Sequence, residues 1–286
     1  MNCELVRVRT SDGLILDGAY HAPPAGIAPS LSVDAFLLIH GTGSNFYAGG
    51  VLETFAVQAM NSGVRVLRVN TRGHDGVCSI PNERGSVKGG ATYETVADCR
   101  YDVAAWIEYL VARGHSRIVL VGHSMGGVKA IYSQAHDLHA AVRAIVGISP
   151  PRFSHANFMS HPLGAKFRED FQTATDLVVR GQPDALFPAR QPLPFLATAA
   201  GYIEKYGPAD RYDIVQHLPH IPCPALILLG SESVATSPAF SGSPESLGSI
   251  AKQLPQVCVQ IVAGADINYS SCPQRPFELS AQWLGT

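Results

Sequence analysis

The stretch RIVLVGHSMGG, residues 117–127, constrains the fold of this chain more than any other. An apolar run typical of a buried parallel strand ends at Gly122, and a helix-compatible sequence begins directly after Ser124. A serine on such a sharp turn must adopt a strained backbone, which requires small residues two positions before and after it, as Gly122 and Gly126 are. The turn predicts a Ser124 hydroxyl raised above a sheet at a helix N-terminus, where negative charge is stabilised. A glycine-rich turn with an incidental serine is the alternative interpretation.

Short β-rich runs alternate with helix-compatible runs through most of the chain. We expect strands at residues 4–10, 14–21, 35–41, 64–70, 117–122, 142–149, 224–230 and 257–264, and helices at 51–63, 93–113, 125–136 and 276–284. The first two strands alternate around Ser-Asp-Gly, which predicts a hairpin. The order of the others predicts parallel strands joined by right-handed crossovers. The fold class is therefore α/β, with a mostly parallel, doubly wound sheet.

Two segments interrupt this alternation. Residues 71–90 form a glycine-rich stretch long enough to suggest a functional or mobile loop. Residues 150–222 are punctuated by prolines between short helical pieces rich in Phe and Tyr. We interpret them as a helical lid inserted over the carboxyl ends of the strands. The predicted organisation is one α/β core, residues 1–149 and 223–286, with a lid insertion at 150–222.

Composition excludes several classes of function. The chain has 286 residues, 46% hydrophobic and 15% charged, enough for one large core, and its 21 basic and 23 acidic residues form no like-charge run. Nucleic acid and membrane surfaces are therefore not expected partners, whereas an uncharged or weakly charged small molecule is. Neither a secretory signal nor a run of about 20 apolar residues is found, so a cytoplasmic protein is expected. The oligomeric state stays open.

The six cysteines are widely spaced and form no C-x-x-C pair. This spacing argues against a zinc site and against a dense disulfide framework, and it favours reduced thiols. We expect neither a metal nor an organic cofactor.

A second motif, His40-Gly41-Thr42-Gly43, follows the strand at residues 35–41. A glycine-containing loop there can aim a backbone N–H at the position that the N–H of Met125 also faces. Thr42 and Met125 are therefore the predicted donors of an oxyanion hole. His40 is expected to pack the loop and not to act as a base.

The strand order and the motifs HGTGSN, NTRGHD, VGHSMGG and PALILLGSE resemble the α/β-hydrolase family over nearly the whole chain. The resemblance implies a serine nucleophile, an acid after a later strand and a histidine after the last strand, in that order. It also implies acyl-transfer chemistry, as in esterases, lipases, lactonases and amidases. The commonest family spacing places the acid at Ser233, so that Glu232, one position earlier, is the best available carboxylate. A surface glutamate without a catalytic role is the alternative.

The histidine of the family pattern is missing. The loop after residues 257–264 places Ile267 where relatives carry histidine, and no histidine follows His220. Loss of this base can lower kcat by about 10⁶. Another histidine could replace it, and His74, His155 and His161 are the candidates. Alternatively, the pocket performs chemistry that needs no serine–histidine relay, or it binds a ligand without turnover.

These observations predict an enzyme that acts on an ester-like or carbonyl-bearing small molecule through Ser124 and an oxyanion hole, with an incomplete triad. The alternatives are a non-hydrolytic enzyme of small-molecule biosynthesis, catalysing a rearrangement, cyclisation or elimination, and a non-catalytic ligand-binding pseudo-hydrolase. Among the remaining side chains, Lys129 is expected to face solvent and Asp266 to cap a turn. Arg72 and Asp75 are expected to order the glycine-rich loop.

Overall fold

The buried apolar runs pair into one sheet of eight strands in the order β1-β2-β4-β3-β7-β8-β11-β12. The computed structural model describes residues 3–285. The strands of this sheet are β1 (Glu4–Arg9), β2 (Ile15–His21), β3 (Ala35–Ile39), β4 (Arg65–Val69), β7 (Ile118–His123), β8 (Val142–Ile148), β11 (Ala225–Gly230) and β12 (Val257–Val262). β1 and β2 form the expected antiparallel hairpin, and all neighbours from β4 to β12 are parallel. The predicted α/β fold class is confirmed.

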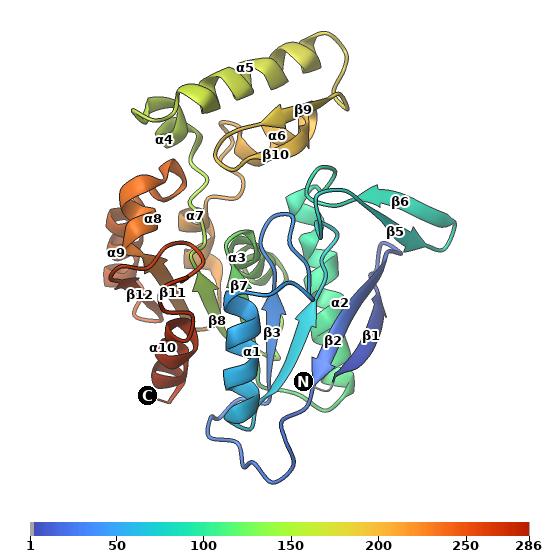
Figure 1. Ribbon diagram of the computed structural model, residues 1–286, viewed down its shortest axis with the longest axis vertical. Coiled ribbons are helices and arrows are strands. Elements are labelled where there is room, and N and C mark those ends of the chain that lie inside the picture. Colours follow the sequence, from blue (N-terminus) through green and yellow to red (C-terminus); the bar gives the residue numbers. More distant parts are fainter. Residues whose placement is uncertain (1–2, 286) are drawn as a thin grey trace.

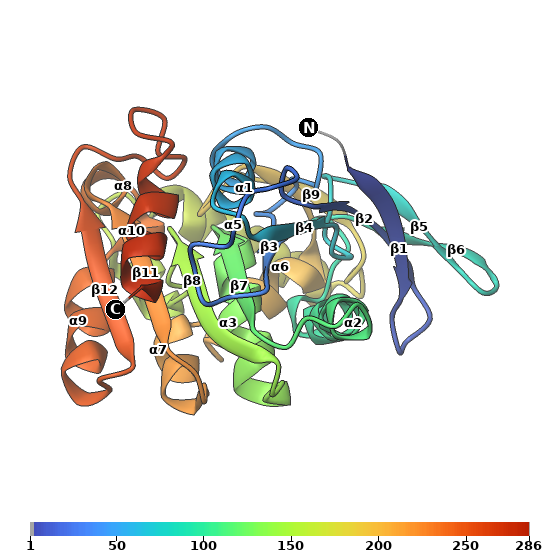
Figure 2. The same ribbon diagram turned by 90° about the horizontal axis from the view of Figure 1, so that it is seen from below.

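Helices cover both faces of the sheet (Figure 2). One face packs against α1 (Val51–Asn61) and α10 (Arg275–Leu284). The other packs against α2 (Cys99–Ala112), which follows the 3-10 turn η1 (Val96–Asp98), and against α3 (Met125–Asp137) and α9 (Ser243–Gln253). Side chains of each central strand alternate between the two cores, as the period of two in a strand requires.

The chain between β8 and β11 extends beyond the carboxyl ends of the strands (Figure 1). It contains α4 (His155–Ser160), α5 (Ala165–Val179), the hairpin of β9 (Leu186–Ala189) and β10 (Phe195–Thr198), and α6 (Ala199–Tyr206). We call residues 155–206 the inserted segment. After it, α7 (Ile214–His217) and η2 (Leu218–His220) return to pack against α3. Of the residues assigned to the core by sequence, positions 1, 2 and 286 lie outside the described residues.

The glycine-rich stretch at 71–90 is not a simple loop. It contains a hairpin of β5 (Cys78–Asn82) and β6 (Gly85–Gly89), which projects from the body of the molecule (Figure 1). The hairpin has few buried side chains, so its sequence lacks the apolar alternation by which strands are predicted. The expected loop after β11 is also partly helical, with α8 (Ser231–Thr236) and η3 (Pro238–Phe240).

Within residues 3–285, every helix is too short or too polar to cross a bilayer.

Candidate active site

Ser124 lies on the turn between β7 and α3, with φ of 51° and ψ of −122°. Two glycines make this turn compatible with the packing around it. A Cβ atom on Gly122 would lie 2.1 Å from the Gly126 carbonyl oxygen, and one on Gly126 would lie 2.1 Å from the Ile39 carbonyl oxygen. The strained backbone that the motif predicts is therefore present, with the Ser124 side chain half-buried at the end of the strand.

Thr42 and Met125, the predicted oxyanion donors, belong to the loop after β3 and to the start of α3. Met125 is the first residue of α3, where an N–H has no partner inside the helix. The loop after β3 approaches the serine closely, since a Cβ on Gly41 would lie 3.2 Å from the Ser124 Cβ. Within residues 3–285, neither N–H group donates a hydrogen bond to the protein.

A cavity of about 330 Å³ opens next to the Ser124 hydroxyl. Thr42, Glu232 and Ile267 line it together with Ser124. The remaining wall comes from the inserted segment and from the segments beside it: Pro151, Phe153, Pro192, Leu193, Tyr206, Ser233, Thr236, Ser237, Ala239, Phe240 and Asp266. The wall is apolar toward the inserted segment, and hydroxyl and carboxylate groups from α8 and the loop after β12 line the rest.

Ile267, the residue predicted to stand at the family's histidine position, lines the same cavity as Ser124. Its carbonyl oxygen accepts a hydrogen bond from Nε2 of His123 at 2.9 Å. Burial lowers the pKa of His123 and so favours a neutral ring that donates through Nε2–H. His123 was missed by the sequence analysis, although it stands within the serine motif. Its hydrogen bond to the Ile267 carbonyl oxygen connects the loop after β12 to the end of β7.

The three histidines considered as replacement bases have other partners. His74 Nδ1 lies 2.8 Å from an Asp75 oxygen, and His155 Nδ1 lies 2.9 Å from the Tyr206 carbonyl oxygen. His161 Nδ1 accepts from the Leu163 N–H at 3.1 Å. Across residues 3–285, no imidazole lies within hydrogen-bonding distance of the Ser124 hydroxyl.

Glu232 is an exposed residue of α8 and one of the residues that line the cavity. Its own N–H donates to the Ala265 carbonyl oxygen at 3.0 Å, which ties α8 to the loop after β12. In the described part of the chain, no side chain or backbone N–H donates a hydrogen bond to the Glu232 carboxylate. Ser233, at the family position for the acid, is buried.

Other residues of the loop after β12 hold its shape. Asp266 accepts from the Ser270 N–H at 2.8 Å and from the Ser270 hydroxyl at 2.7 Å, and these bonds hold the pKa of Asp266 below its usual range. It caps the turn as expected. Tyr269, in the same loop, is buried in the core on the α1 and α10 face of the sheet.

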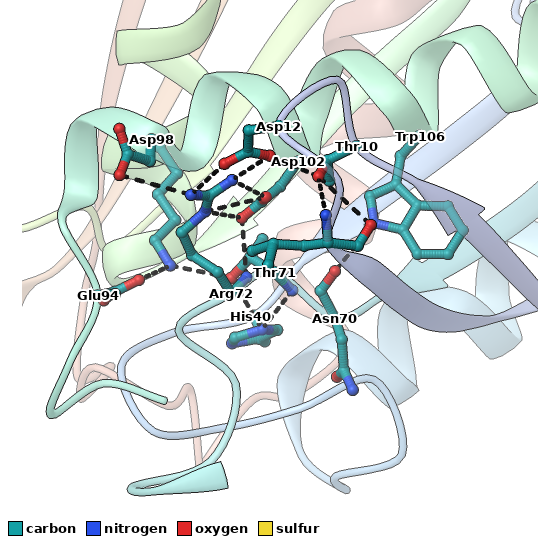
Figure 3. Close-up of polar contacts among 12 residues, drawn as sticks. Thr10, Asp12, His40, Asn70, Thr71, Arg72, Glu94, Asp98, Asp102 and Trp106 are labelled. Carbon is teal, nitrogen blue, oxygen red and sulfur yellow. Dashed lines mark hydrogen bonds and ion pairs between the residues drawn. The ribbon is translucent and has the colours of Figure 1, made fainter. Parts of the chain in front are cut away.

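His40, at the start of the Thr42 loop, belongs to a buried polar network (Figure 3). His40 accepts from the Thr71 N–H at 3.1 Å, and burial lowers the pKa of His40 to about 3. This neutral, packed ring is the structural role predicted for it. Lys129 donates to the Thr71 hydroxyl at 2.9 Å and to Glu94 at 2.6 Å. The expectation that Lys129 faces solvent was wrong, because sheet and neighbouring helices enclose the first turns of α3 on all sides.

Arg72 orders the start of the glycine-rich stretch. Its guanidinium forms an ion pair with Asp102 at 2.9 Å and further ion pairs with Asp12 and Asp98 (Figure 3). The backbone N–H of Arg72 also donates to the Asp102 carboxylate, at 2.8 Å. Asp75 holds the Thr42 loop by accepting from Asn45 at 2.7 Å. Both residues therefore have the loop-ordering contacts that were predicted. Within residues 3–285, no group of three or more His, Cys, Asp or Glu side chains is arranged to hold a metal ion.

Comparisons with known proteins agree with this architecture. No curated protein sequence matches the chain. Among solved structures, Est1E from Butyrivibrio proteoclasticus with ferulic acid bound is similar at 17% identity and a TM-score of 0.69, covering 97% of both chains. The Pyrococcus furiosus esterase Pf2001 has 16% identity and a TM-score of 0.64, with 99% of this chain and 90% of that chain covered.

The alpha/beta hydrolase GrgF from Penicillium sp. sh18 has 14% identity and a TM-score of 0.69, with 100% of this chain and 98% of that chain covered. Likeness at these identities shows the fold alone. The family profile described as "Alpha/beta hydrolase family" matches residues 36–274, which span both the serine turn and the loop that carries Ile267. The chain belongs to the alpha/beta hydrolase family.

Proposed function

We propose that this protein is an enzyme that acts on a small ester-like or other carbonyl-bearing molecule in the cavity beside Ser124. The strained Ser124 turn carries the proposal, because a non-glycine residue at φ of 51° costs free energy that packing alone does not require. A volume of about 330 Å³ suits a small ligand. The carboxylates of Glu232 and Asp266 on its wall favour an uncharged substrate over an acid.

The proposed reaction is acyl transfer. The substrate carbonyl oxygen lies between the N–H groups of Thr42 and Met125, and the Ser124 oxygen attacks the carbonyl carbon. The resulting oxyanion is stabilised by both donors, each of which contributes about 3 kcal/mol in comparable sites. The Ser124 proton passes to water as the new bond forms. Collapse of the intermediate breaks the bond to the leaving oxygen, which departs as an anion and takes its proton from solvent. A water molecule then hydrolyses the acyl group to a carboxylic acid and restores the Ser124 hydroxyl.

The incomplete relay sets the expected substrate preference. Without an imidazole beside Ser124, the leaving group receives no proton from the enzyme. Esters with acidic leaving groups, such as phenols, should therefore react much faster than esters of simple alcohols.

A second candidate function is favoured by the Glu232 carboxylate. It lines the same cavity as Ser124 without a hydrogen-bonding partner among the described residues, and Ile267 removes the usual relay. A carboxylate so placed could take a proton from the carbon next to a carbonyl, with the enolate oxygen held by Thr42 and Met125. Such chemistry leads to elimination or rearrangement instead of hydrolysis.

Labelling with a fluorophosphonate followed by intact-mass measurement tests the nucleophile. The wild-type protein should gain one phosphonyl group, and Ser124→Ala should gain none. Absence of labelling in the wild type would reject acyl transfer through Ser124. If Glu232→Gln then still binds small carbonyl ligands as the wild type does, and neither protein turns them over, the ligand-binding alternative holds.

Replacing Ile267 tests the missing base. Ile267→His should raise phenyl-ester hydrolysis by about 10² or more, since general-base catalysis typically contributes 10²–10⁴. Ile267→Ala is the matched control, because it opens the same space without an imidazole and should respond to added imidazole in solution. Unchanged rates in Ile267→His would show that this loop is not the place of the base.

A further inference from the structure

Cys78, His74 and Asp75 form a relay outside the Ser124 cavity. The Cys78 sulfur lies 3.5 Å from Nε2 of His74, and Nδ1 of the same ring lies 2.8 Å from an Asp75 carboxylate oxygen. Nucleophile, imidazole and orienting carboxylate thus stand in the order that activates catalytic thiols and hydroxyls. The imidazole that Ser124 lacks is present here beside a sulfur atom.

The relay is held in one arrangement by its surroundings. Asp75 accepts from the Asn45 amide at 2.7 Å, and its N–H donates to the Ser44 carbonyl oxygen at 2.8 Å. Against the opposing effect of partial burial, the bonds from Asn45 and His74 hold the pKa of Asp75 below its usual range. An ionised Asp75 accepts the Nδ1–H of His74, so Nε2 carries the lone pair that faces the thiol.

The thiol itself rests in its neutral form. Partial burial, with the nearby carboxylates of Asp75 and Glu94, raises the pKa of Cys78 to about 11. A thiol in this state reacts only if a base removes its proton during the attack. His74 is placed to do this, as the histidine of a serine triad does for a hydroxyl.

The three side chains of the relay are partly exposed to solvent. His74 lines an open hollow of about 570 Å³ together with Phe46, Tyr47 and Asn70. The His74 side chain is 16% exposed and that of Asp75 is 33% exposed, and Cys78 is half-buried at the start of β5. The relay therefore has solvent access that a core cysteine such as Cys99 lacks.

We propose that Cys78 is a nucleophilic modification site for small, uncharged α,β-unsaturated carbonyl compounds. The sulfur forms a bond to the β-carbon while the carbon–carbon π electrons move into an enolate. Nε2 of His74 takes the thiol proton and returns it to the α-carbon. All atoms of both partners are retained in the adduct, and the addition needs no oxidant or further reactant. This site stands on contacts that do not involve Ser124.

N-ethylmaleimide tests the proposal, with adduct formation at each cysteine followed by peptide mass spectrometry near neutral pH. Cys3 is an exposed thiol and serves as the internal reference. A thiol with the pKa of Cys78 and no assisting base should react about tenfold or more slowly than an ordinary exposed thiol. Assistance by His74 predicts instead that Cys78 reacts at least as fast as Cys3.

Variants separate assistance from simple exposure. His74→Asn should slow the reaction of Cys78 by about tenfold or more and leave Cys3 unchanged. His161→Asn is the matched control and should change neither rate, and Ser124→Ala should also leave Cys78 reactive. Cys99 should stay unmodified in every variant, which reports that the fold is retained. The proposal would be overturned if Cys78 of the wild type reacted with N-ethylmaleimide far more slowly than Cys3. It would also be overturned if Cys78 reacted at the same rate in the wild type and in His74→Asn.

Discussion

At the scale of the residue, Ser124 is distinguished by its strained backbone. Its φ of 51° lies where glycine is favoured, and the conformation costs about 1–3 kcal/mol for other residues. The Ser124 N–H donates to the Ile148 carbonyl oxygen at 2.8 Å, and its own carbonyl accepts from Gly127 at 2.9 Å. These bonds hold the turn in place against the strain.

Relief of this strain is measurable. Ser124→Gly should unfold with a free energy about 1 kcal/mol higher than Ser124→Ala, because glycine adopts positive φ readily while alanine keeps the strain. Urea denaturation of both variants gives the comparison, and both should be inert to fluorophosphonate. Equal stability of the two variants would mean that the backbone at this position is not strained.

At the scale of the element, α3 can lie against the end of β3 only because Gly126, in its first turn, has no side chain. A Cβ on Gly126 would come within 2.1 Å of the Ile39 carbonyl oxygen, which is backbone and cannot move aside. Gly248, on α9, has no atom within 4 Å of the corresponding position. Two helical glycines thus differ in what surrounds them.

This difference predicts opposite effects of one substitution. Gly126→Ala should lower the free energy of unfolding by about 3 kcal/mol through overpacking, and it should displace the Met125 N–H. Gly248→Ala should raise it by about 0.5–1 kcal/mol, since alanine is the better helix former. Thermal unfolding of both variants checks the pair, and a Gly126→Ala protein as stable as the wild type would refute the close approach.

At the scale of the whole molecule, Glu94 joins the core to the inserted segment. It accepts from Lys129 of α3 at 2.6 Å and pairs with Lys205 of α6 at 3.4 Å, and all three side chains are buried. Burial by itself would raise the pKa of Glu94, but the two ammonium groups prevail and lower it to about 2 from 4.5. The carboxylate therefore stays ionised while the protein is folded.

The lowered pKa has a definite effect on stability against pH. A folded pKa below the unfolded one gives Glu94 a stabilising contribution that is complete above about pH 4.5 and lost as the pH falls toward 2. Glu94→Gln should lower the free energy of unfolding by about 3–5 kcal/mol near neutral pH, because two buried ammonium groups lose their partner. As the pH falls from about 4.5 to 2, the free energy of unfolding of Glu94→Gln should decrease less steeply than that of the wild type. The two slopes should differ by about 1.4 kcal/mol per pH unit.

Urea denaturation across this pH range provides the measurement. Asp17→Asn, which removes the exposed Arg7–Asp17 pair, is the control and should leave the stability near neutral pH unchanged. Parallel pH profiles for wild type and Glu94→Gln would contradict the pairing of Glu94 with Lys129 and Lys205.

Local patterns in the sequence determined the parallel sheet, the serine turn and the structural role of His40. Continuous apolar runs predict strands buried on both faces, and the spacing of Gly122 and Gly126 around Ser124 reports a backbone constraint that few other residues meet. The prediction that Ile267 stands at the family's histidine position also came from the sequence alone. Each of these features depends on residues close together in the chain.

Only the tertiary structure decided which side chains meet across long distances. Lys129 has the sequence context of a surface lysine, yet the elements packed around α3 bury it against Glu94. The bond from His123 to the Ile267 carbonyl joins residues 144 positions apart. Such contacts arise from the packing of whole elements, which periodicity along the chain does not encode.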